Sequence, residues 1–420
     1  MNALACLNNV LDNVEMPDMQ LKGLHMVLEE KKVLLGYDTG TGKTYTFAGI
    51  VRALLNRDPI KKHILIIIND SIEQVPRDVA QLVRVPVETF NGAADSISRL
   101  RFYWERTSIF CLTLEAVQQL AVVEFLFQKL PEIESWTIDE AHHVSNWDSS
   151  DTAFMIRSLV RCIPYVIELS ATPMTRESKQ FYRLQNLLDR HCSPHRDETF
   201  RDRYINHYLP VNRADYDIKG KYTPTLITVD PTLDQMRPQS GIVFRHLKGT
   251  GAAPQVKALV EFVQARLQQG KRVLVYLHYH DTRQWVEQNF TEQGIQFASL
   301  HGRLRTRADR QAVLDQFRSK EVDVLITSVT ESLNIEADVV VFYEFTTLVK
   351  QVIGRAHRGL QGKELEVAFV ITKESDEVDY FIRYIYQRSL TIQKLLQKDY
   401  SELIAIGRQV ELMQLEREGS

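Results

Sequence analysis

Cysteine is scarce in this sequence, and no long stretch of it is uniformly apolar. The four cysteines lie too far apart for a zinc ribbon or a dithiol redox site, so we expect reduced, metal-free thiols at Cys6, Cys111, Cys162 and Cys192. No segment approaches the run of about 20 apolar residues that crosses a bilayer, so no membrane association is expected. The first residues, MNALACLNNVLDNVEM, lack a basic stretch before an apolar one, which predicts no secretion signal and a cytoplasmic location.

An excess of charge of one sign is also absent. The 420 residues include 51 Lys and Arg against 54 Asp and Glu, which gives a formal net charge of −3. This balance excludes a uniformly basic coat for nucleic acid but not a basic groove, because binding depends on where the charges lie. With 44% hydrophobic and 25% charged residues, the composition predicts an ordinary soluble globular protein.

The length and the hydrophobic pattern predict two α/β lobes. A chain of 420 residues exceeds what one core usually organises, and short Val, Ile and Leu runs alternate with amphipathic segments, as in buried parallel strands joined by helices. Strands are expected at 32–37, 63–69, 109–113, 136–139 and 165–170, then at 272–279, 296–301, 322–327, 339–343 and 365–371. The predicted parts are an N-terminal lobe (1–208), an irregular connection that can contain a few short strands (209–254), a C-terminal lobe (255–375), and a C-terminal helix with a polar tail that packs on a lobe or frays (376–420).

The first motif, YDTGTGKT, follows a predicted strand and opens a predicted helix. This is the order of a P-loop: its glycines let backbone amides approach phosphates, its lysine reaches the β- and γ-phosphates, and its last threonine can ligate Mg²⁺. The predicted ATP-binding residues here are Thr39, Gly40, Thr41, Gly42, Lys43 and Thr44. Tyr37 stands where Gly or Ala is usual. A flexible strand-to-helix turn is the alternative interpretation.

Two further motifs end predicted buried strands of the first lobe. In WTIDEAHHVSNW, Asp139 could hold Mg²⁺, Glu140 could polarise an attacking water, and His142 could link the site to its surroundings. In IELSATP, the hydroxyls of Ser170 and Thr172 could sense the γ-phosphate and couple it to a bound partner. The alternatives are an acidic helix start for the first motif and a strand cap for the second.

The second lobe contains an arginine motif, QVIGRAHRGLQGK. On a helix, Gln351, Arg355 and Arg358 fall on one face. Arginines supplied from a second lobe can stabilise charge that develops on a γ-phosphate, so these three residues are candidates for catalysis. Isolated arginines on a helix surface are, however, more often simply solvated.

Together and in this order, TGTGKT, DEAH, SATP and QVIGRAHR resemble the signature of superfamily 2 helicases and translocases over Asp18–Thr372. Within that superfamily, QVIGRAHRGLQ preceded by SLHGRLRTRADRQAVLDQF is similar to the SWI/SNF-type DNA-dependent ATPases. The resemblance implies two tandem RecA-like P-loop lobes, ATP and Mg²⁺ as cofactors, and movement along double-stranded DNA. Gln20 in MPDMQLKGL matches the glutamine that reads adenine in these families.

The resemblance also implies contacts with a nucleic-acid backbone, at Asn69, Ser71, Thr113, His278, Thr327 and Ser328. Three alternatives remain open: a helicase that unwinds or branch-migrates DNA, a helicase that acts on single-stranded DNA or RNA, and a non-catalytic nucleotide-gated clamp. We expect a monomer that works alone or with a protein partner in a replication, repair or restriction assembly. In a bacterial or viral setting it would associate with the nucleoid.

Overall fold

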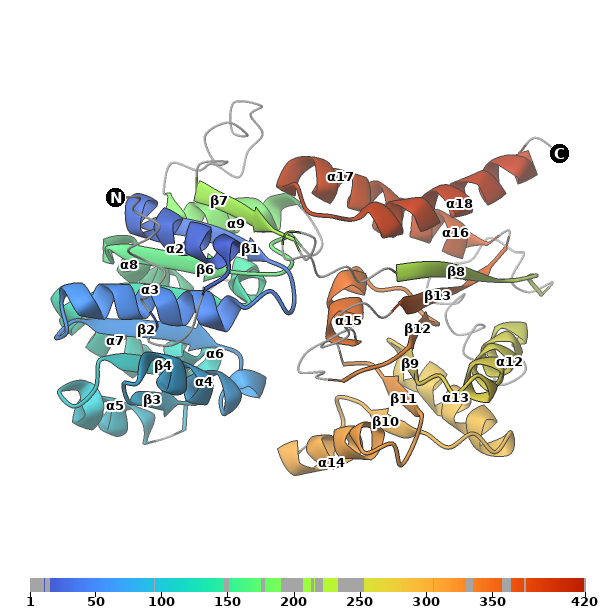
Figure 1. The fold of residues 1–420 in the computed structure, drawn as a ribbon, viewed down its shortest axis with the longest axis horizontal. Helices are drawn as coiled ribbons and strands as arrows, with labels where there is room; N and C mark the ends of the chain where they lie inside the picture. The colour runs from blue at the N-terminus through green and yellow to red at the C-terminus, as the bar shows by residue number, and fades with distance from the viewer. Residues whose placement is uncertain are drawn as a thin grey trace. The chain divides into compact units, whose positions relative to one another are not determined.

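The computed structural model describes residues 11, 16–93, 95–146, 151–174, 178–189, 207–212, 215, 222–232, 253–304, 306–329, 335–356, 364–373 and 375–418. The chain divides into two compact units, Met1–Asp217 and Ile218–Ser420. Each unit has its own parallel sheet with helices packed on it (Figure 1).

The first unit is built on a seven-stranded sheet in the order β3-β4-β2-β5-β6-β1-β7, with every neighbouring pair parallel. The strands are β1 (Lys32–Tyr37), β2 (Lys62–Ile67), β3 (Val87–Phe90), β4 (Ile109–Thr113), β5 (Ile133–Asp139), β6 (Tyr165–Leu169) and β7 (Tyr208–Val211). The α-helices are α2 (Asp18–Glu30), α3 (Lys43–Arg57), α4 (Gln74–Val83), α5 (Ser96–Trp104), α6 (Leu114–Val117), α7 (Leu120–Gln128), α8 (Asp151–Cys162) and α9 (Ser178–Leu188). Short 3₁₀ turns are η1 (Asn69–Ser71), η2 (Leu130–Glu132) and η3 (Ala141–Asn146).

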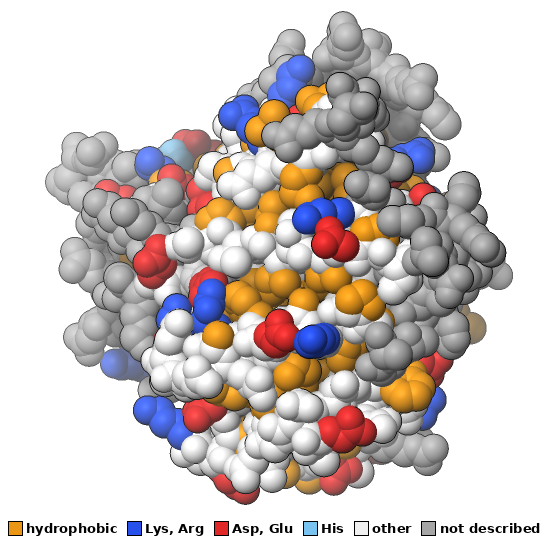
Figure 2. All heavy atoms as spheres, turned by 90° about the vertical axis from the view of Figure 1, so that its right-hand side faces the viewer, with side chains coloured by type: hydrophobic (Ala, Val, Ile, Leu, Met, Phe, Trp, Pro, Cys, Tyr) orange, Lys and Arg blue, Asp and Glu red, His pale blue; other side chains and the backbone are white. Residues whose placement is uncertain are grey.

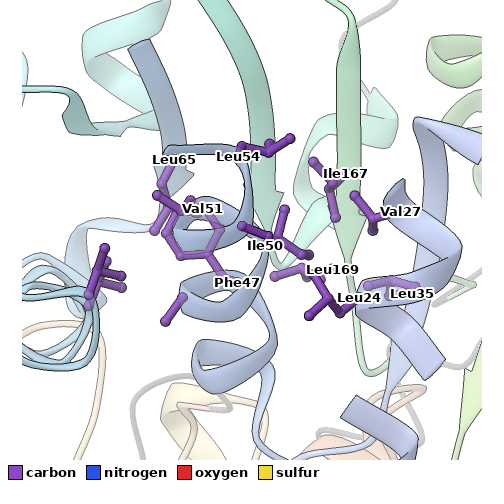
Figure 3. Packing of buried hydrophobic residues seen from close by; sticks show 14 of the residues in the cluster. Leu24, Val27, Leu35, Phe47, Ile50, Val51, Leu54, Leu65, Ile167 and Leu169 are labelled. Atoms are coloured by element: carbon purple, nitrogen blue, oxygen red, sulfur yellow. The ribbon is translucent and has the colours of Figure 1, made fainter. Parts of the chain in front are cut away.

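One face of this sheet is covered by α2 and α3, and their apolar residues form the core shown in Figure 3. Phe47, Ile50 and Leu54 recur at helical spacing along α3 and are almost completely buried. Leu24 of α2 and Ile167 of β6 belong to the same cluster. This packing fixes the start of α3, and the loop before it, against the carboxyl end of β1.

The second unit contains a six-stranded sheet in the order β10-β11-β9-β12-β13-β8, again with parallel neighbours. Its strands are β8 (Tyr222–Val229), β9 (Val273–Tyr276), β10 (Ala298–Leu300), β11 (Val324–Thr327), β12 (Val339–Phe342) and β13 (Leu365–Thr372). The helices are α12 (Pro254–Gln268), α13 (His280–Glu292), α14 (Arg307–Arg318), α15 (Val349–Ala356), α16 (Asp376–Phe381), the π-helix η6 (Ile382–Tyr386), α17 (Gln387–Leu396) and α18 (Ser401–Glu418).

The predicted fold class is confirmed: two α/β lobes, each with a parallel sheet flanked by helices, and a helical C-terminus. Each predicted strand is found, with ends shifted by a few residues at most. The pattern missed β3, and it allowed short strands in the connection without locating β7 and β8. All three lie at sheet edges. Edge strands need no continuous apolar run, and they tolerate proline, as at Pro210 and Pro224 within the predicted connection.

The tail that follows the C-terminal helix is itself helical and packs on the second unit as α18. Leu403, Ile406 and Val410 recur at helical spacing and are buried. The preceding helix, α17, ends at Leu396, and the φ of its C-cap Gln397, +51°, lies in the left-handed region that terminates helices. Among the described residues, no helix has the length and apolar character needed to cross a membrane.

Candidate active site

The loop between β1 and α3 has the geometry of a phosphate cradle. Gly40 and Gly42 both have a φ of +84°, a conformation that favours glycine. Thr41 Oγ1 donates a hydrogen bond of 2.7 Å to the carbonyl oxygen of Asp38, which tightens the loop. α3 then begins at Lys43. The loop therefore leads into a helix N-terminus, where free N–H groups and the helix dipole favour a phosphate.

Lys43 lies against the two acidic residues that end β5. Its Nζ atom is 2.7 Å from Oε1 of Glu140 and 3.9 Å from Oδ1 of Asp139. The sheet order explains the meeting, because β6 alone separates β5 from β1 and parallel strands bring their carboxyl ends to one edge. The side chains of Lys43, Asp139 and Glu140 are 15%, 17% and 7% exposed. The P-loop and the DEAH motif thus form one largely desolvated charged cluster within the first unit.

The DEAH motif is joined to the SATP motif through side chains. His142 Nδ1 lies 3.5 Å from Oε2 of Glu140 and 3.2 Å from Oγ of Ser170. The backbone N–H of Thr172 donates to the same Ser170 oxygen at 3.2 Å. Glu140 itself has a φ of +49°, a strained value for a residue with a side chain. A movement at Glu140 can therefore reach β6 through two short contacts.

Gln20 of α2 packs against the P-loop. Its Nε2 atom donates to the carbonyl oxygen of Thr41 at 3.3 Å, and its Oε1 atom is buried without a hydrogen-bond partner among the described residues. A Cβ atom on Gly42 would lie only 2.0 Å from Nε2 of Gln20. The glycine is therefore required for this contact as well as for its backbone conformation. The free Oε1 atom is an acceptor beside the loop that can face the amino group of a base.

In the second unit, α15 carries two of the three predicted residues of the arginine motif. Gln351 is buried and Arg355 half-buried, one turn apart on this helix of eight residues. Arg358 lies outside the described residues. The structure therefore places Gln351 and Arg355 together, in a different unit from Lys43.

The candidate nucleic-acid contacts of the first unit follow the ends of β2 and β4. Asn69 is exposed and Ser71 half-buried in η1, directly after β2. Thr113 differs, because its side chain is fully buried and its Oγ1 atom accepts a 3.2 Å hydrogen bond from the N–H of Ala116 as the cap of α6. Its hydroxyl has a structural role here, which leaves Asn69 and Ser71 as the accessible candidates.

The candidates of the second unit also end neighbouring strands. His278 follows β9 with an exposed side chain, and Ser328 follows β11 half-buried. Thr327 is fully buried and its hydroxyl closes a turn with the backbone of Val329. His278 and Ser328 are thus the ones that can reach a ligand at this edge of the sheet.

The sequence did not reveal the residue that holds the His278 loop. Glu344, after β12, is 5% exposed, and its carboxylate accepts hydrogen bonds from the N–H groups of His278 (2.6 Å) and Tyr279 (2.8 Å) and from Thr282 Oγ1 (2.7 Å). An acidic residue ending a buried strand is the signal that could have identified it, as it did for Asp139. Glu344 fixes the loop from behind and leaves the His278 side chain exposed.

A different face of the second unit does not present a basic surface. Figure 2 shows hydrophobic side chains on it among isolated basic and acidic ones, and no patch of Lys and Arg gathers there in the part of the chain that is described. A polyanion requires such a patch. This face is therefore a poor candidate for contact with a polyanion.

The residues present fit ATP and Mg²⁺. The loop glycines adopt the left-handed backbone of a phosphate cradle, Lys43 supplies a positive charge, and Gln20 keeps an unpaired acceptor. Thr44 and Asp139 offer the oxygen ligands that Mg²⁺ prefers. The donor set is that of a magnesium nucleotide site.

Two family models match the chain. A DEAD/DEAH box helicase model matches residues 17–181, and a helicase conserved C-terminal domain model matches residues 254–359. UvrABC system protein B of Anaplasma phagocytophilum (strain HZ) is 30% identical over 165 residues, which are 37% of this chain and 25% of that protein. The chain spans about a quarter of the length of the curated relatives it matches.

Solved structures are similar over most of the chain. The Hef helicase domain of Pyrococcus furiosus has a TM-score of 0.57 at 16% sequence identity, covering 86% of this chain and 96% of that one. The SWI2/SNF2 ATPase core of Sulfolobus solfataricus, solved in complex with dsDNA, has a TM-score of 0.43 at 15% identity, covering 90% and 93%. The likeness to the Hef domain shows a shared fold.

The two matched helicase domains follow each other in the same order as the sequence motifs, one in each structural unit. Together they cover more than half of the chain. The chain therefore belongs to the superfamily 2 helicases, the family of nucleic-acid-dependent ATPases that its motifs predicted.

Proposed function

We propose that this protein hydrolyses ATP to move along double-stranded DNA. The observation that carries the ATPase part is the 2.7 Å contact of Lys43 with Glu140, which joins the P-loop and the DEAH motif in one cluster. The double-stranded track is supported by the resemblance of QVIGRAHRGLQ to the SWI/SNF-type ATPases. Movement along the duplex without strand separation is the form of activity that this resemblance favours.

The residues of the first unit divide the chemistry among them. Lys43 would neutralise phosphate charge, and Thr44 and Asp139 would hold Mg²⁺, which supplies further charge neutralisation when bound. Glu140 would orient the attacking water and accept its proton. His142, Ser170 and Thr172 would transmit the state of the site to bound nucleic acid through the contacts between DEAH and SATP.

We assign the second unit a complementary role. Gln351, Arg355 and Arg358 would face the γ-phosphate held by the first unit and stabilise the charge that develops there. Such arginines contribute about 10³- to 10⁵-fold to the rate in related chemistry. Opening and closing of the two units with each turnover would then advance the protein along DNA held by Asn69, Ser71, His278 and Ser328.

The test is a Glu140→Gln substitution combined with a panel of nucleic acids. In the wild type, we expect duplex DNA to stimulate ATP hydrolysis more than single-stranded DNA or RNA does. Glu140→Gln should reduce stimulated turnover by about 10²-fold or more, because the amide cannot accept the proton, while ATP binding persists. Unchanged duplex-stimulated turnover in the variant would refute the assignment of the base.

The same panel separates the alternatives. Stronger stimulation by single-stranded DNA or RNA, with strand separation in an unwinding assay, would replace translocation by a helicase activity. Turnover at background level with each nucleic acid, despite ATP binding, would indicate a nucleotide-gated clamp. A need for an added protein before stimulation appears would point to a motor subunit of a larger assembly.

A further inference from the structure

Tyr37 is an unusually large residue for the first position of a P-loop, and the structure accommodates it in the core. Its side chain is completely buried beneath α2 and α3, within the hydrophobic core of the first unit. Its hydroxyl donates a 3.2 Å hydrogen bond to the carbonyl oxygen of Met19. Burial raises the pKa of the Tyr37 hydroxyl, so the group remains protonated and acts as a donor.

Gly23 makes this arrangement possible. A Cβ atom at position 23 would lie 2.3 Å from the Tyr37 hydroxyl and 3.5 Å from Cγ2 of Thr46. The first distance is far below van der Waals contact, so any other residue at position 23 would displace the ring or the helix. Tyr37 and Gly23 are therefore matched in size, and the hydroxyl sits where α2 crosses α3.

The hydrogen bond reaches α2 next to its functional residue. Met19 immediately precedes Gln20 in the first turn of the helix, and the Pro17 N-cap supplies no side-chain hydrogen bond there. Gln20 in turn donates to the carbonyl oxygen of Thr41 in the P-loop. Two hydrogen bonds thus connect β1 with the P-loop through α2. Tyr37 at the end of β1 bonds Met19, and the next residue, Gln20, bonds Thr41.

We propose that Tyr37 is a positioning residue for base selection, holding α2 so that Oε1 of Gln20 faces the base. The inference rests on the proposed function, in which Gln20 reads adenine. A Gly or Ala at position 37 could not form the hydrogen bond. The P-loop of this protein therefore contributes to the choice of base through its strand, in addition to binding phosphate.

The experiment measures equilibrium affinities for ATP and GTP, with fluorescent analogues, in Tyr37→Phe. The variant keeps the ring and loses the hydroxyl, so the first turn of α2 is freed while the core stays filled. We expect the ratio of ATP to GTP affinity to fall about fivefold, the equivalent of one neutral hydrogen bond, with phosphate binding retained.

Tyr165→Phe is the matched control. Tyr165 is buried in the same cluster, on β6, and its hydroxyl accepts a 3.2 Å hydrogen bond from Nη1 of Arg57, far from the P-loop in sequence. Its loss should lower thermal stability without changing the affinity ratio. Gly23→Ala alone should lower the ratio of ATP to GTP affinity. When it is introduced into Tyr37→Phe, the same substitution should lower this ratio much less.

The outcomes distinguish the proposal from the function beneath it. If Gln20→Ala lowers the affinity ratio and Tyr37→Phe leaves it at the wild-type value, the positioning role is refuted and the ATPase assignment stands. If Gln20→Ala also leaves the ratio unchanged, Gln20 does not read the base, and the base-reading role and the positioning role are both refuted. The ATPase assignment is tested separately by Glu140→Gln. An equal fall in Tyr37→Phe and Tyr165→Phe would show a general loss of stability, and would also refute the positioning role.

Discussion

The two units share a layout of parallel strands and covering helices, but they hold their candidate residues in different ways. In the first unit the functional side chains contact one another, as Lys43 does with Glu140 and His142 does with Ser170. In the second unit Glu344 fixes a backbone loop and leaves the side chain of His278 exposed. The first unit gathers its candidate side chains in one charged cluster, whereas the second holds the backbone of a loop whose candidate side chain is exposed.

A pair of substitutions tests this contrast most strongly. Lys43→Ala should abolish both ATP binding and turnover, because it removes the positive charge from the cluster of the first unit. Arg355→Ala should leave ATP binding nearly unchanged and reduce kcat by about 10³-fold, because the proposed role of Arg355 is to act only on the charge that develops during hydrolysis. Equilibrium nucleotide binding and steady-state ATPase rates, measured on both variants, provide the comparison.

Equal losses of ATP affinity in the two variants would break the contrast. Arg355 would then be part of the ground-state binding site. Lys350→Ala is a suitable control, because Lys350 lies on the same helix, α15. Its Nζ atom lies 4.6 Å from the centroid of the Tyr400 ring. It should affect stability more than kcat.

A second prediction concerns the loop that Glu344 holds. Glu344→Gln keeps the size of the side chain but replaces one acceptor oxygen with an N–H donor, so the N–H groups of His278 and Tyr279 and the hydroxyl of Thr282 cannot all remain bonded. We expect DNA affinity to fall about tenfold, while ATP affinity without DNA stays at the wild-type value. Fluorescence anisotropy with labelled duplex gives the first quantity.

Glu366 provides the matched control for Glu344. It is also a buried carboxylate of the second unit, and it accepts two 2.7 Å hydrogen bonds from Arg266, which help to hold its pKa below the ordinary value. It lies near the start of β13, whereas Glu344 follows the end of β12. Glu366→Gln should lower stability and leave DNA affinity unchanged. A loss of DNA affinity in both variants would show that Glu344 acts only through general stability.

The sequence predicted most of the fold because buried parallel strands require unbroken apolar runs. It did not give the bounds of β7 or β8, where proline and threonine are compatible with an edge strand but give no apolar run. The P-loop and DEAH residues could be assigned because their chemistry is contained in short motifs. Their meeting at 2.7 Å follows from the strand order, which the sequence does not state.

Contacts between distant residues were beyond the reach of sequence patterns. Tyr37 was recognised as a departure from the usual P-loop, but its partner Gly23 has no motif of its own, because the requirement for glycine arises only when α2 is packed on β1. The burial of Thr113 and Thr327 could not be predicted either. A threonine whose hydroxyl caps a helix or closes a turn looks the same in the sequence as one whose hydroxyl faces a ligand. Packing decides which role the residue takes.

The smallest expected effect is a pH dependence of the free energy of unfolding, and it is expected in the first unit alone. His63 of β2 is fully buried, and its Nδ1 atom lies 2.8 Å from Oγ of Ser135. Burial and the neighbouring Lys62 lower the pKa of His63 to about 3, from an ordinary value of 6.5. The unfolded chain therefore binds a proton that the folded chain excludes.

The contribution of neutral His63 to stability is fully present above pH 6.5 and is lost as the pH falls from there toward 3. Between pH 7 and 5.5 the free energy of unfolding of the first unit should drop by about 1 kcal/mol through this group, and His63→Gln should remove that part of the decrease. Denaturant unfolding at the two pH values measures the difference, and an identical decrease in wild type and variant would show that another group causes it.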